Sequence, residues 1–280
     1  MPEPTDAPTD PAEAPPADVA AAAEPADATA TAPVAATPDG DGAGAAATAD
    51  ADEAWRARLP SPVHLPTRFE LALYRTIRAA LVALSRLWFR LEVVDKDRMP
   101  SSGPFVLAPV HRSNIDFFLV AALTKTRMRY MGKDSLWKVP LLGRFIAALG
   151  AFPVRRGKAD REALRTCMTI IENGEPLVMF PEGTRREGDQ VDDVFDGPAY
   201  VAARTGVPLV PVGIGGSDKA MPVGSKWIRP AKIVLVVGDP IHPPKGDGSG
   251  RVPRRVVREM TEQLRTDVQR LYDDARHRAG

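Results

Sequence analysis

A histidine and an aspartate, His111 and Asp116, stand between two apolar runs of this 280-residue sequence. The run 105–108 predicts a buried strand, and the run 117–120 predicts the start of a helix, so both side chains fall at a strand-to-helix turn. A neutral imidazole can take up a proton near neutral pH. A carboxylate bonded to its other nitrogen fixes the tautomer and stabilises the cation that forms. The pair could therefore deprotonate an attacking hydroxyl.

The same residues also fit the start of a helix without any chemistry. Ser113 and Asp116 have the spacing of a capping box, in which Ser113 is the N-cap and Asp116 lies in the first turn. Short motifs of this kind match often by chance. Catalysis therefore needs support from other parts of the chain.

A second polar turn follows the apolar run 177–180, which predicts another buried strand. Glu182, Gly183, Thr184 and Arg185 stand in this turn. Ligands of open α/β sheets bind at the carboxyl ends of strands, and glycine allows a positive φ or a close approach of a ligand to the backbone. A surface turn with a Glu–Arg pair explains any one of these residues, but explains the set less well.

A third segment, 150–156, predicts a short strand that ends in Arg155 and Arg156. The planar, permanently charged guanidinium suits the oxygens of a phosphate. Taken alone, two arginines at the end of a strand are usually just solvated surface charges.

Composition divides the chain into an acidic tail and a basic body. Residues 1–54 hold twelve acids and no lysine or arginine, so the remainder carries 37 bases and 36 − 12 = 24 acids, a net charge of +13. The tail, rich in alanine and proline, lacks the apolar surface that would offset its ordering entropy, and we expect it to be disordered. The basic body suits anionic partners: phosphorylated substrates, an anionic membrane face or nucleic acid. No known nucleic-acid-binding motif appears, so the last is the weakest of the three. The single cysteine, Cys167, excludes an internal disulfide and is expected to pack in the core, and no Cys/His cluster predicts a metal site.

Residues 55–90 are predicted to form an amphipathic N-terminal helix, and its helical pattern is read over residues 67–92. At about 100° per residue its arginines share one side: Arg68, Arg75, Arg78, Arg86 and Arg90. Apolar residues share the other: Phe69, Leu73, Ile77, Leu84, Leu87, Trp88 and Leu91. Such a helix lies in a membrane interface or packs its apolar face on the core, and the sequence leaves both open. The arginines interrupt it too often for a transmembrane span.

The segment 133–149 mixes apolar residues with Lys133, Lys138 and Arg144. It predicts either core helices interrupted by Pro140 and Gly143 or a second patch that faces a membrane or an acyl chain. The sequence favours the core.

The remaining runs predict strands at 91–94, 129–131, 208–212 and 232–237. Helices are expected at 114–124, 160–173, 199–204 and 251–275. Pro211 should confine its strand to an edge or a bulge. Alternating strands and helices favour an α/β fold with a mixed, mainly parallel sheet flanked by helices, built from residues 91–280 with a C-terminal helix.

Four blocks in this order resemble the glycerolipid acyltransferase family, of the lysophosphatidate (1-acylglycerol-3-phosphate) acyltransferase type. They are His111-Arg112-Ser113-Asn114-Ile115-Asp116, Gly150-Ala151-Phe152-Pro153-Val154-Arg155-Arg156, Phe180-Pro181-Glu182-Gly183-Thr184-Arg185 and Val207-Pro208-Leu209-Val210-Pro211-Val212. The first is the family's His-x4-Asp box. The third is an intact match to its acid-glycine-threonine-arginine block. The likeness covers roughly residues 90–240.

This resemblance implies transfer of a fatty acyl group from a thioester to a lysophospholipid hydroxyl, with phosphatidic acid as product when the acceptor is 1-acyl-sn-glycerol 3-phosphate. His111 would be the general base and Asp116 its orienting partner. Arg156 and Arg185 would bind the acceptor's phosphate, with Glu182, Gly183 and Thr184 also at the substrate site. No cofactor or metal is implied. The co-substrate would be acyl-CoA or acyl-acyl-carrier protein, and the enzyme would sit on the anionic cytoplasmic face of the cell membrane without spanning it or binding nucleic acid.

The chain departs from the family pattern at three places. Val110 stands where the family often has Asn, Arg155 where an acid often stands, and Phe195-Asp196-Gly197 where a lysine often follows phenylalanine. These differences bear on the acceptor more than on the reaction. Glycerol 3-phosphate or another lyso-lipid remains an alternative acceptor, and a non-catalytic lipid-binding module of the same fold remains an alternative function.

Overall fold

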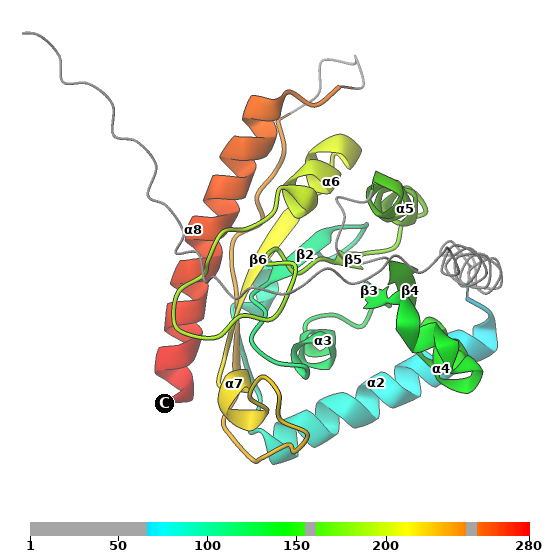
Figure 1. The fold of residues 1–280 in the computed structure, drawn as a ribbon, viewed down its shortest axis with the longest axis vertical. Helices are drawn as coiled ribbons and strands as arrows, with labels where there is room; N and C mark the ends of the chain where they lie inside the picture. Colours follow the sequence, from blue (N-terminus) through cyan, green and yellow to red (C-terminus); the bar gives the residue numbers. More distant parts are fainter. Residues whose placement is uncertain (1–65, 155–160, 245–250) are drawn as a thin grey trace, which may run out of the picture. The chain divides into compact units, whose positions relative to one another are not determined.

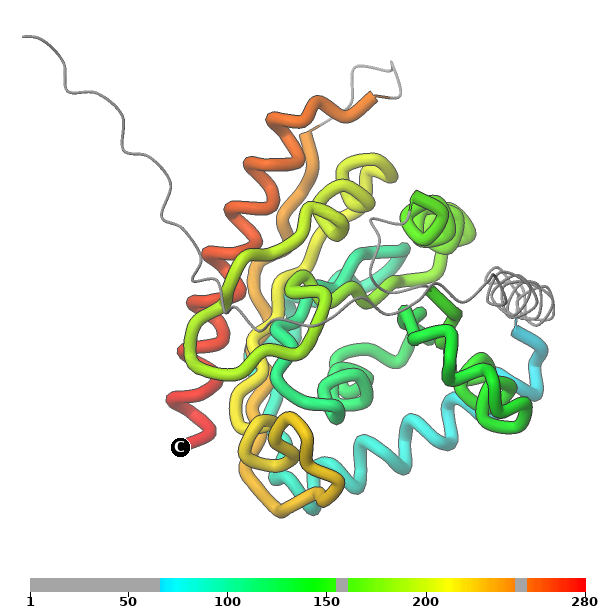
Figure 2. The backbone as a smooth tube through the Cα atoms, in the orientation of Figure 1, coloured from blue at the N-terminus to red at the C-terminus, as the bar shows by residue number. Residues whose placement is uncertain are grey.

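The computed structural model of the protein describes residues 66–154, 161–244 and 251–280 (Figures 1 and 2). The acidic tail, the start of the segment 55–90 and both Arg155 and Arg156 lie outside the described residues. Predictions about them remain predictions.

Seven strands of the described residues form one sheet, in the order β1-β7-β6-β2-β5-β3-β4. Their bounds are β1 (Glu92–Val94), β2 (Val106–Pro109), β3 (Arg129–Lys133), β4 (Ala151–Val154), β5 (Leu177–Val178), β6 (Leu209–Gly215) and β7 (Val234–Val237). β6 and β7 pair antiparallel, and the five other neighbouring pairs are parallel. The prediction of a mixed, mainly parallel sheet flanked by helices is confirmed.

Helices lie along both sides of this sheet. They are α2 (Arg68–Trp88), α3 (Asp116–Leu119), α4 (Pro140–Ala148), α5 (Arg161–Glu172), α6 (Gly197–Thr205), α7 (Ser217–Ala220) and α8 (Arg254–Ala279), with short 3₁₀ segments η1 (Lys96–Arg98), η2 (Val120–Ala122) and η3 (Asp134–Lys138). In Figure 1, α5 and α6 lie above the sheet and α2 and α3 below it. α8 packs along β6 and β7. The core is made of the buried side chains of β2, β5, β6 and β7 with those of the covering helices.

Two glycines allow the close packing of α8 on β6. A Cβ at Gly213 would lie 2.2 Å from the carbonyl oxygen of Leu271, and one at Gly215 would lie 2.3 Å from that of Ala275. Any larger residue would push the helix away from the sheet. The helix is therefore held against the strand by direct backbone approach, and this matters for the site described below.

Pro211 lies in β6, which is an interior strand, so the edge alternative is wrong and the bulge alternative holds. Leu209 bridges Ile241, and the regular pairing starts again at Val212 with Val237. Two residues of β6 therefore face three residues of the returning chain, 238–240. The missing N–H of proline falls in this irregular step, where no ladder bond is lost.

α2 starts with a capping box that the sequence analysis did not note. The N–H of Glu70 donates to the Thr67 hydroxyl (3.2 Å), and the N–H of Thr67 donates to the Glu70 carboxylate (2.7 Å). The helix ends at Trp88, and Arg90 has a φ of 47°, outside the helical region. The helix is therefore shorter at its end than the predicted 67–92.

α2 buries only a part of its apolar side chains against the protein. Tyr74 and Val82 are buried, while Phe69, Leu84, Leu87 and Trp88 are exposed. Arg78, expected on the outer arginine face, points inward and donates through Nε to the carbonyl oxygens of Ala121 (2.9 Å) and Thr124 (2.7 Å). A large part of the predicted apolar face thus lies on the surface.

The prediction that 133–149 packs in the core is wrong for most of its apolar residues. Trp137 is buried, but Leu141 is 81% exposed, and Leu136, Val139, Leu142 and Phe145 are also exposed. Pro140 begins α4, and Gly143 lies within it rather than interrupting it. A Cβ at Gly143 would be 2.8 Å from Cδ1 of Trp137. The indole fills the space beneath the helix, so the other apolar side chains point outward.

Within the part of the chain that the structure describes, no helix has the length and apolar character needed to cross a bilayer.

Candidate functional site

Two neighbouring parallel strands deliver the two predicted turns to one edge of the sheet. β2 pairs with β5, and the chain leaves β2 toward His111 and β5 toward Glu182. The backbone N–H of Arg186 donates to the carbonyl oxygen of His111 at 3.0 Å. The two turns, about 70 residues apart in the sequence, are therefore joined at the carboxyl ends of their strands.

The histidine and aspartate form the predicted pair. Nδ1 of His111 lies 3.0 Å from Oδ2 of Asp116, whose side chain is fully buried. The same oxygen accepts the N–H groups of Arg112 (2.8 Å) and Ser113 (2.7 Å). A carboxylate accepts but does not donate, so Nδ1 carries the proton and Nε2 keeps its lone pair. The histidine side chain is 14% exposed and that of Asp116 is not exposed, so the histidine is the member of the pair that reaches the surface.

The capping-box interpretation holds for half of the motif. Asp116 accepts the N–H of Ser113, as a capping acid does, but the Ser113 hydroxyl donates to the carbonyl oxygen of Met221 at 2.6 Å. The N-cap of α3 is Ile115, without a side-chain cap. The aspartate therefore serves both the turn and the histidine, and the two readings of the motif do not exclude each other.

The imidazole is also held by an aromatic ring from the second turn. The rings of His111 and Phe180 stack with centroids 3.9 Å apart and planes inclined by 24°. Together with the bond to Asp116, this contact limits rotation of the imidazole. A fixed ring suits a general base, because proton transfer needs a set geometry.

Glu182, predicted at the substrate site, lies in the interior instead. Its side chain is fully buried, its Oε2 accepts the backbone N–H of His111 (2.9 Å), and its Oε1 lies 2.5 Å from Nη1 of Arg112. Direct contact with a substrate is therefore not available to this carboxylate. It shapes the site by holding the backbone of His111.

Arg112 is the buried partner that sequence reasoning missed. Its side chain is 1% exposed and donates to Glu182, to the carbonyl oxygen of His111 (3.2 Å) and to that of Gln190 (2.9 Å). Burial alone lowers the pKa of this guanidinium, but the hydrogen bond and charge of Glu182 outweigh it, so the pKa is raised. A charge so placed without its partner would be costly.

α8 closes this interior side. The guanidinium of Arg112 lies over the ring of Tyr272, 4.7 Å from its centroid. The Tyr272 hydroxyl donates to the carbonyl oxygen of Gly188 (3.1 Å), and Gln269 accepts the N–H of Val191 (2.6 Å). Burial raises the pKa of Tyr272, with Arg112 acting in the opposite direction. The sequence held one sign that Tyr272 would be buried. It stands four residues after Val268 and so continues the apolar stripe of the C-terminal helix.

The other predicted residues of the second turn are open to solvent. Gly183 has a φ of 67°, which favours glycine. A Cβ there would also lie 2.7 Å from Cε2 of Phe195, so the exposed ring of Phe195 would have to move. Thr184 is exposed and Arg185 half-buried. Among the described residues, no hydrogen bond or ion pair engages the Arg185 guanidinium. Arg156 lies outside the described residues, so the structure brings together His111, Asp116 and the turn that carries Arg185, but not the second arginine.

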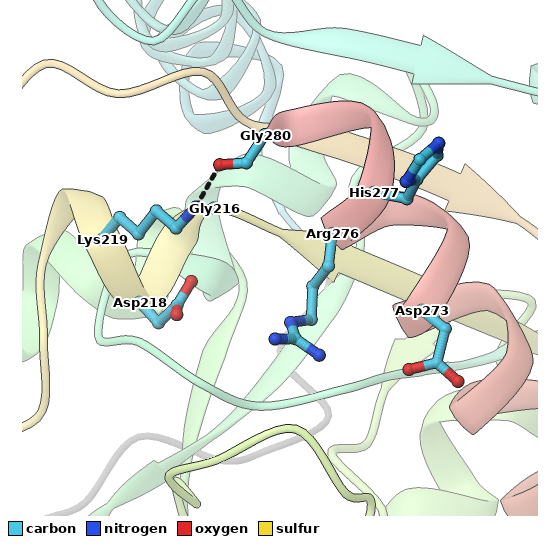
Figure 3. A pocket seen from close by; sticks show the side chains of 7 residues that line it. All are labelled: Gly216, Asp218, Lys219, Asp273, Arg276, His277 and Gly280. Atoms are coloured by element: carbon cyan, nitrogen blue, oxygen red, sulfur yellow. Dashed lines mark hydrogen bonds between the residues drawn. The ribbon is translucent and has the colours of Figure 1, made fainter.

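A separate pocket of about 330 Å³ lies between α7 and the end of α8 (Figure 3). It is lined by Gly216, Asp218, Lys219, Asp273, Arg276, His277 and Gly280, with Lys219 donating to the carbonyl oxygen of Gly280. None of the predicted site residues borders it. Over the described residues no cluster of metal-ligating side chains is found, here or elsewhere.

Comparison with known proteins points to one family. Residues 90–215 match the family model described as Acyltransferase. The chain is 28% identical over 176 residues to a 1-acyl-sn-glycerol-3-phosphate acyltransferase of Arabidopsis thaliana chloroplasts, covering 59% of this chain and 49% of that protein. It is 26% identical over 200 residues to one of Bacillus subtilis, covering 71% and 96%. The chain thus spans about half the length of the chloroplast relative and nearly all of the bacterial one.

A solved structure has the same fold. The crystal structure of the 1-acyl-sn-glycerophosphate acyltransferase PlsC from Thermotoga maritima superposes with a TM-score of 0.58 at 25% sequence identity, and covers 73% of this chain and 78% of that one. The match extends beyond the residues of the family model.

Proposed function

We propose that this chain, whose residues 90–215 match the Acyltransferase family model, transfers a fatty acyl group from an acyl thioester to the free hydroxyl of 1-acyl-sn-glycerol 3-phosphate, giving phosphatidic acid. The observation that carries the proposal is the joining of two turns at one sheet edge. In the first turn, His111 is hydrogen-bonded to Asp116. In the second turn, Arg185 directly precedes Arg186, whose backbone N–H donates to the carbonyl oxygen of His111.

In the proposed reaction Nε2 of His111 takes the proton of the acceptor hydroxyl. The oxygen attacks the thioester carbonyl carbon, a C–O bond forms, and the C–S bond breaks. The imidazolium returns its proton to the leaving thiolate. Asp116 stabilises the imidazolium through Nδ1. A thioester is already activated, so a base worth about 10²–10⁴-fold and alignment of the two substrates suffice without a metal.

The acceptor's phosphate is proposed to bind at the second turn. Arg185 offers a permanently charged fork that no described residue neutralises, and Gly183 lets a ligand approach the backbone. Arg156 is proposed as the second cation. Phe117 and Phe195 are exposed rings beside the two turns, and they offer apolar walls for a lipid.

We further propose that the protein acts as a peripheral enzyme on the anionic cytoplasmic face of the cell membrane. The exposed apolar side chains of α2 and α4 support this, because both helices contact each other and both carry exposed arginines, Arg75 and Arg144 among them. Such a surface combines apolar area with charge for lipid phosphates.

A transfer assay tests the proposed function. Purified protein is given acyl-CoA or acyl-acyl-carrier protein with 1-acyl-sn-glycerol 3-phosphate, glycerol 3-phosphate or a phosphate-free monoacylglycerol, beside His111→Ala. We expect product only with an acceptor that carries phosphate, and none with His111→Ala. If only glycerol 3-phosphate accepted the acyl group, the proposed acceptor would be wrong. Full activity of His111→Ala would overturn the mechanism.

A further inference from the structure

The chain between α7 and β7 carries an exposed apolar loop that the proposed function does not use. Trp227 is 80% exposed, and Val223 and Ile228 are exposed beside it. A group of exposed apolar side chains with polar residues around it is typical of an interaction site, whereas a single exposed one is not. The loop is therefore a candidate interaction surface.

The loop is held in shape by its own hydrogen bonds. The N–H of Ser225 donates to the carbonyl oxygen of Pro222 (3.0 Å), and its hydroxyl bonds both the carbonyl oxygen (3.0 Å) and the N–H (3.1 Å) of Trp227. The N–H of Arg229 closes the loop on the carbonyl oxygen of Ala220 at 2.8 Å. The indole is thus presented on a fixed backbone, which reduces the entropy lost on binding.

The charge of the loop is of one sign. Residues 221–232 contain Lys226, Arg229 and Lys232 and no acid. Lys232 pairs with Glu92 at 3.1 Å, whereas Lys226 and Arg229 are exposed without an ion pair among the described residues. An apolar tip with unpaired cations on both sides complements an anionic membrane, in which charged headgroups cover an apolar interior.

The loop lies next to the end of α2 and is tied to the catalytic turn. The N–H of Ile233 donates to the carbonyl oxygen of Phe89, one residue beyond α2, at 3.0 Å. α2 exposes Leu84, Leu87 and Trp88 in its last turn and a half. Both segments reach the lower edge of Figure 1. At its other end the loop begins at Met221, whose carbonyl oxygen accepts the Ser113 hydroxyl at 2.6 Å.

We propose that the loop 222–229 inserts Trp227 and Ile228 into the headgroup region of an anionic bilayer and, with the end of α2, forms a two-part membrane contact. Tryptophan favours this region because its ring is apolar and its N–H polar. Through Ser113, the contact places the His111 turn at the bilayer surface, where a lysolipid acceptor lies. The placing of the acceptor rests on the proposed function; the membrane contact does not.

Vesicle flotation tests the contact without any catalysis. Full-length protein is mixed with phosphatidylcholine vesicles with or without phosphatidylglycerol, and the bound fraction is compared for wild type, Trp227→Ser and His111→Ala. We expect Trp227→Ser to lower the partition coefficient on anionic vesicles about tenfold, and His111→Ala to bind like wild type. Binding of Trp227→Ser within twofold of wild type would overturn the proposal.

A matched pair of charge variants separates specific contact from net charge. Lys226→Glu with Arg229→Glu changes the loop, and Arg254→Glu with Arg258→Glu makes the same change in net charge on exposed positions of α8. We expect the loop variant to lose roughly tenfold or more of its binding to anionic vesicles, and the α8 variant markedly less. Equal losses would show that only total charge matters and would contradict a loop contact.

Two further readouts exclude other occupants and other effects. If the loop bound a second copy of the chain, Trp227→Ser would change the size of the protein in light scattering and leave vesicle binding unchanged, which would overturn the proposal. With an acceptor dissolved below its micelle concentration, we expect Trp227→Ser to keep activity within about twofold, while activity on vesicle-borne acceptor falls about tenfold. An equal fall in both assays would contradict a role in membrane contact; inactivity of wild type in both would refute only the proposed function.

Discussion

The two sides of the His111 turn are built in opposite ways. The interior side is closed: Arg112 and Glu182 are buried, bonded to each other, and covered by Tyr272 of α8. The other side is open: Thr184 is exposed, Arg185 has no partner among the described residues, and the Phe195 ring is 63% exposed. The closed side pairs its charged groups within the protein, although the buried Nε of Arg112 has no hydrogen-bond partner among the described residues. The open side leaves the charge of Arg185 for a ligand.

This difference separates two kinds of residue that the sequence motif presents together. Glu182 and Arg185 stand three residues apart in one block, yet Glu182 is buried and paired with Arg112, and Arg185 is the residue proposed to meet the substrate. Variants of the closed side should therefore lower the unfolding temperature, and variants of the open side should raise the Michaelis constant.

The largest effect is expected at the junction of the two sides. His111→Ala removes the proposed base and should lower kcat by about 10²–10⁴-fold. Asp116 keeps its bonds to the N–H groups of Arg112 and Ser113, so the unfolding temperature should change little. Steady-state kinetics and calorimetry on the same preparation measure both, and a variant with wild-type kcat would end the assignment of His111 as base.

Glu182→Gln should have the largest effect on stability. It leaves the Arg112 guanidinium buried without a counter-charge, which costs about 3–5 kcal/mol and should lower the unfolding temperature by roughly 6–20 °C. Glu187→Gln, a few residues on and exposed, is the matched control and should shift it by less than about 2 °C. If both variants melt like wild type, the closed side does not carry the stability assigned to it.

Arg185→Ala should act on binding instead. Loss of a charge-assisted contact to phosphate is worth about 1.5–3 kcal/mol, so the Michaelis constant for 1-acyl-sn-glycerol 3-phosphate should rise roughly 10–100-fold with an unchanged unfolding temperature. Arg186→Ala is the control, because its side chain is exposed and lies 3.9 Å from Asp192. Equal Michaelis constants for both variants would remove Arg185 from the phosphate site.

The smallest effect is expected for Tyr272→Phe. It keeps the ring under Arg112 and loses only the bond to Gly188, about 0.5–1.5 kcal/mol. Burial raises the pKa of Tyr272 in the folded state above its ordinary value of 10.0. As the pH rises above that value, the tyrosine therefore loses its proton in the unfolded chain before it does so in the folded protein. The corresponding stability is present below pH 10 and is lost as the pH rises further.

Denaturant unfolding from pH 8 to 11 measures that prediction. Wild type should lose more stability over this range than Tyr272→Phe, and their difference should shrink as the pH rises. A difference that stays constant with pH would mean that the hydroxyl is not held in its neutral form by burial.

The positions of the two turns at strand ends and the type of sheet could be predicted from the sequence. Apolar runs that end in polar residues placed His111 and Arg185 at the ends of strands, and the structure shows those strands side by side. The alternation of elements predicted the sheet type. Both depend on short stretches of sequence, where the pattern itself carries the information.

What the sequence did not reveal depends on contacts between distant segments. The burial of Arg112 follows from Tyr272, far along the chain, and an arginine is rarely buried without a partner. The outward turn of α4 follows from Trp137 filling the space beneath Gly143. Periodicity shows that a helix has two faces, but which face is covered is decided by neighbours that one sequence does not identify.

The release of thiol from an acyl thioester, followed with 1-acyl-sn-glycerol 3-phosphate and with its phosphate-free counterpart, tests the central claim most directly. We expect thiol release that requires an acceptor, that favours the phosphate form by at least about tenfold, and that disappears in His111→Ala. Equal release without any acceptor, or release by His111→Ala at the wild-type rate, would contradict it.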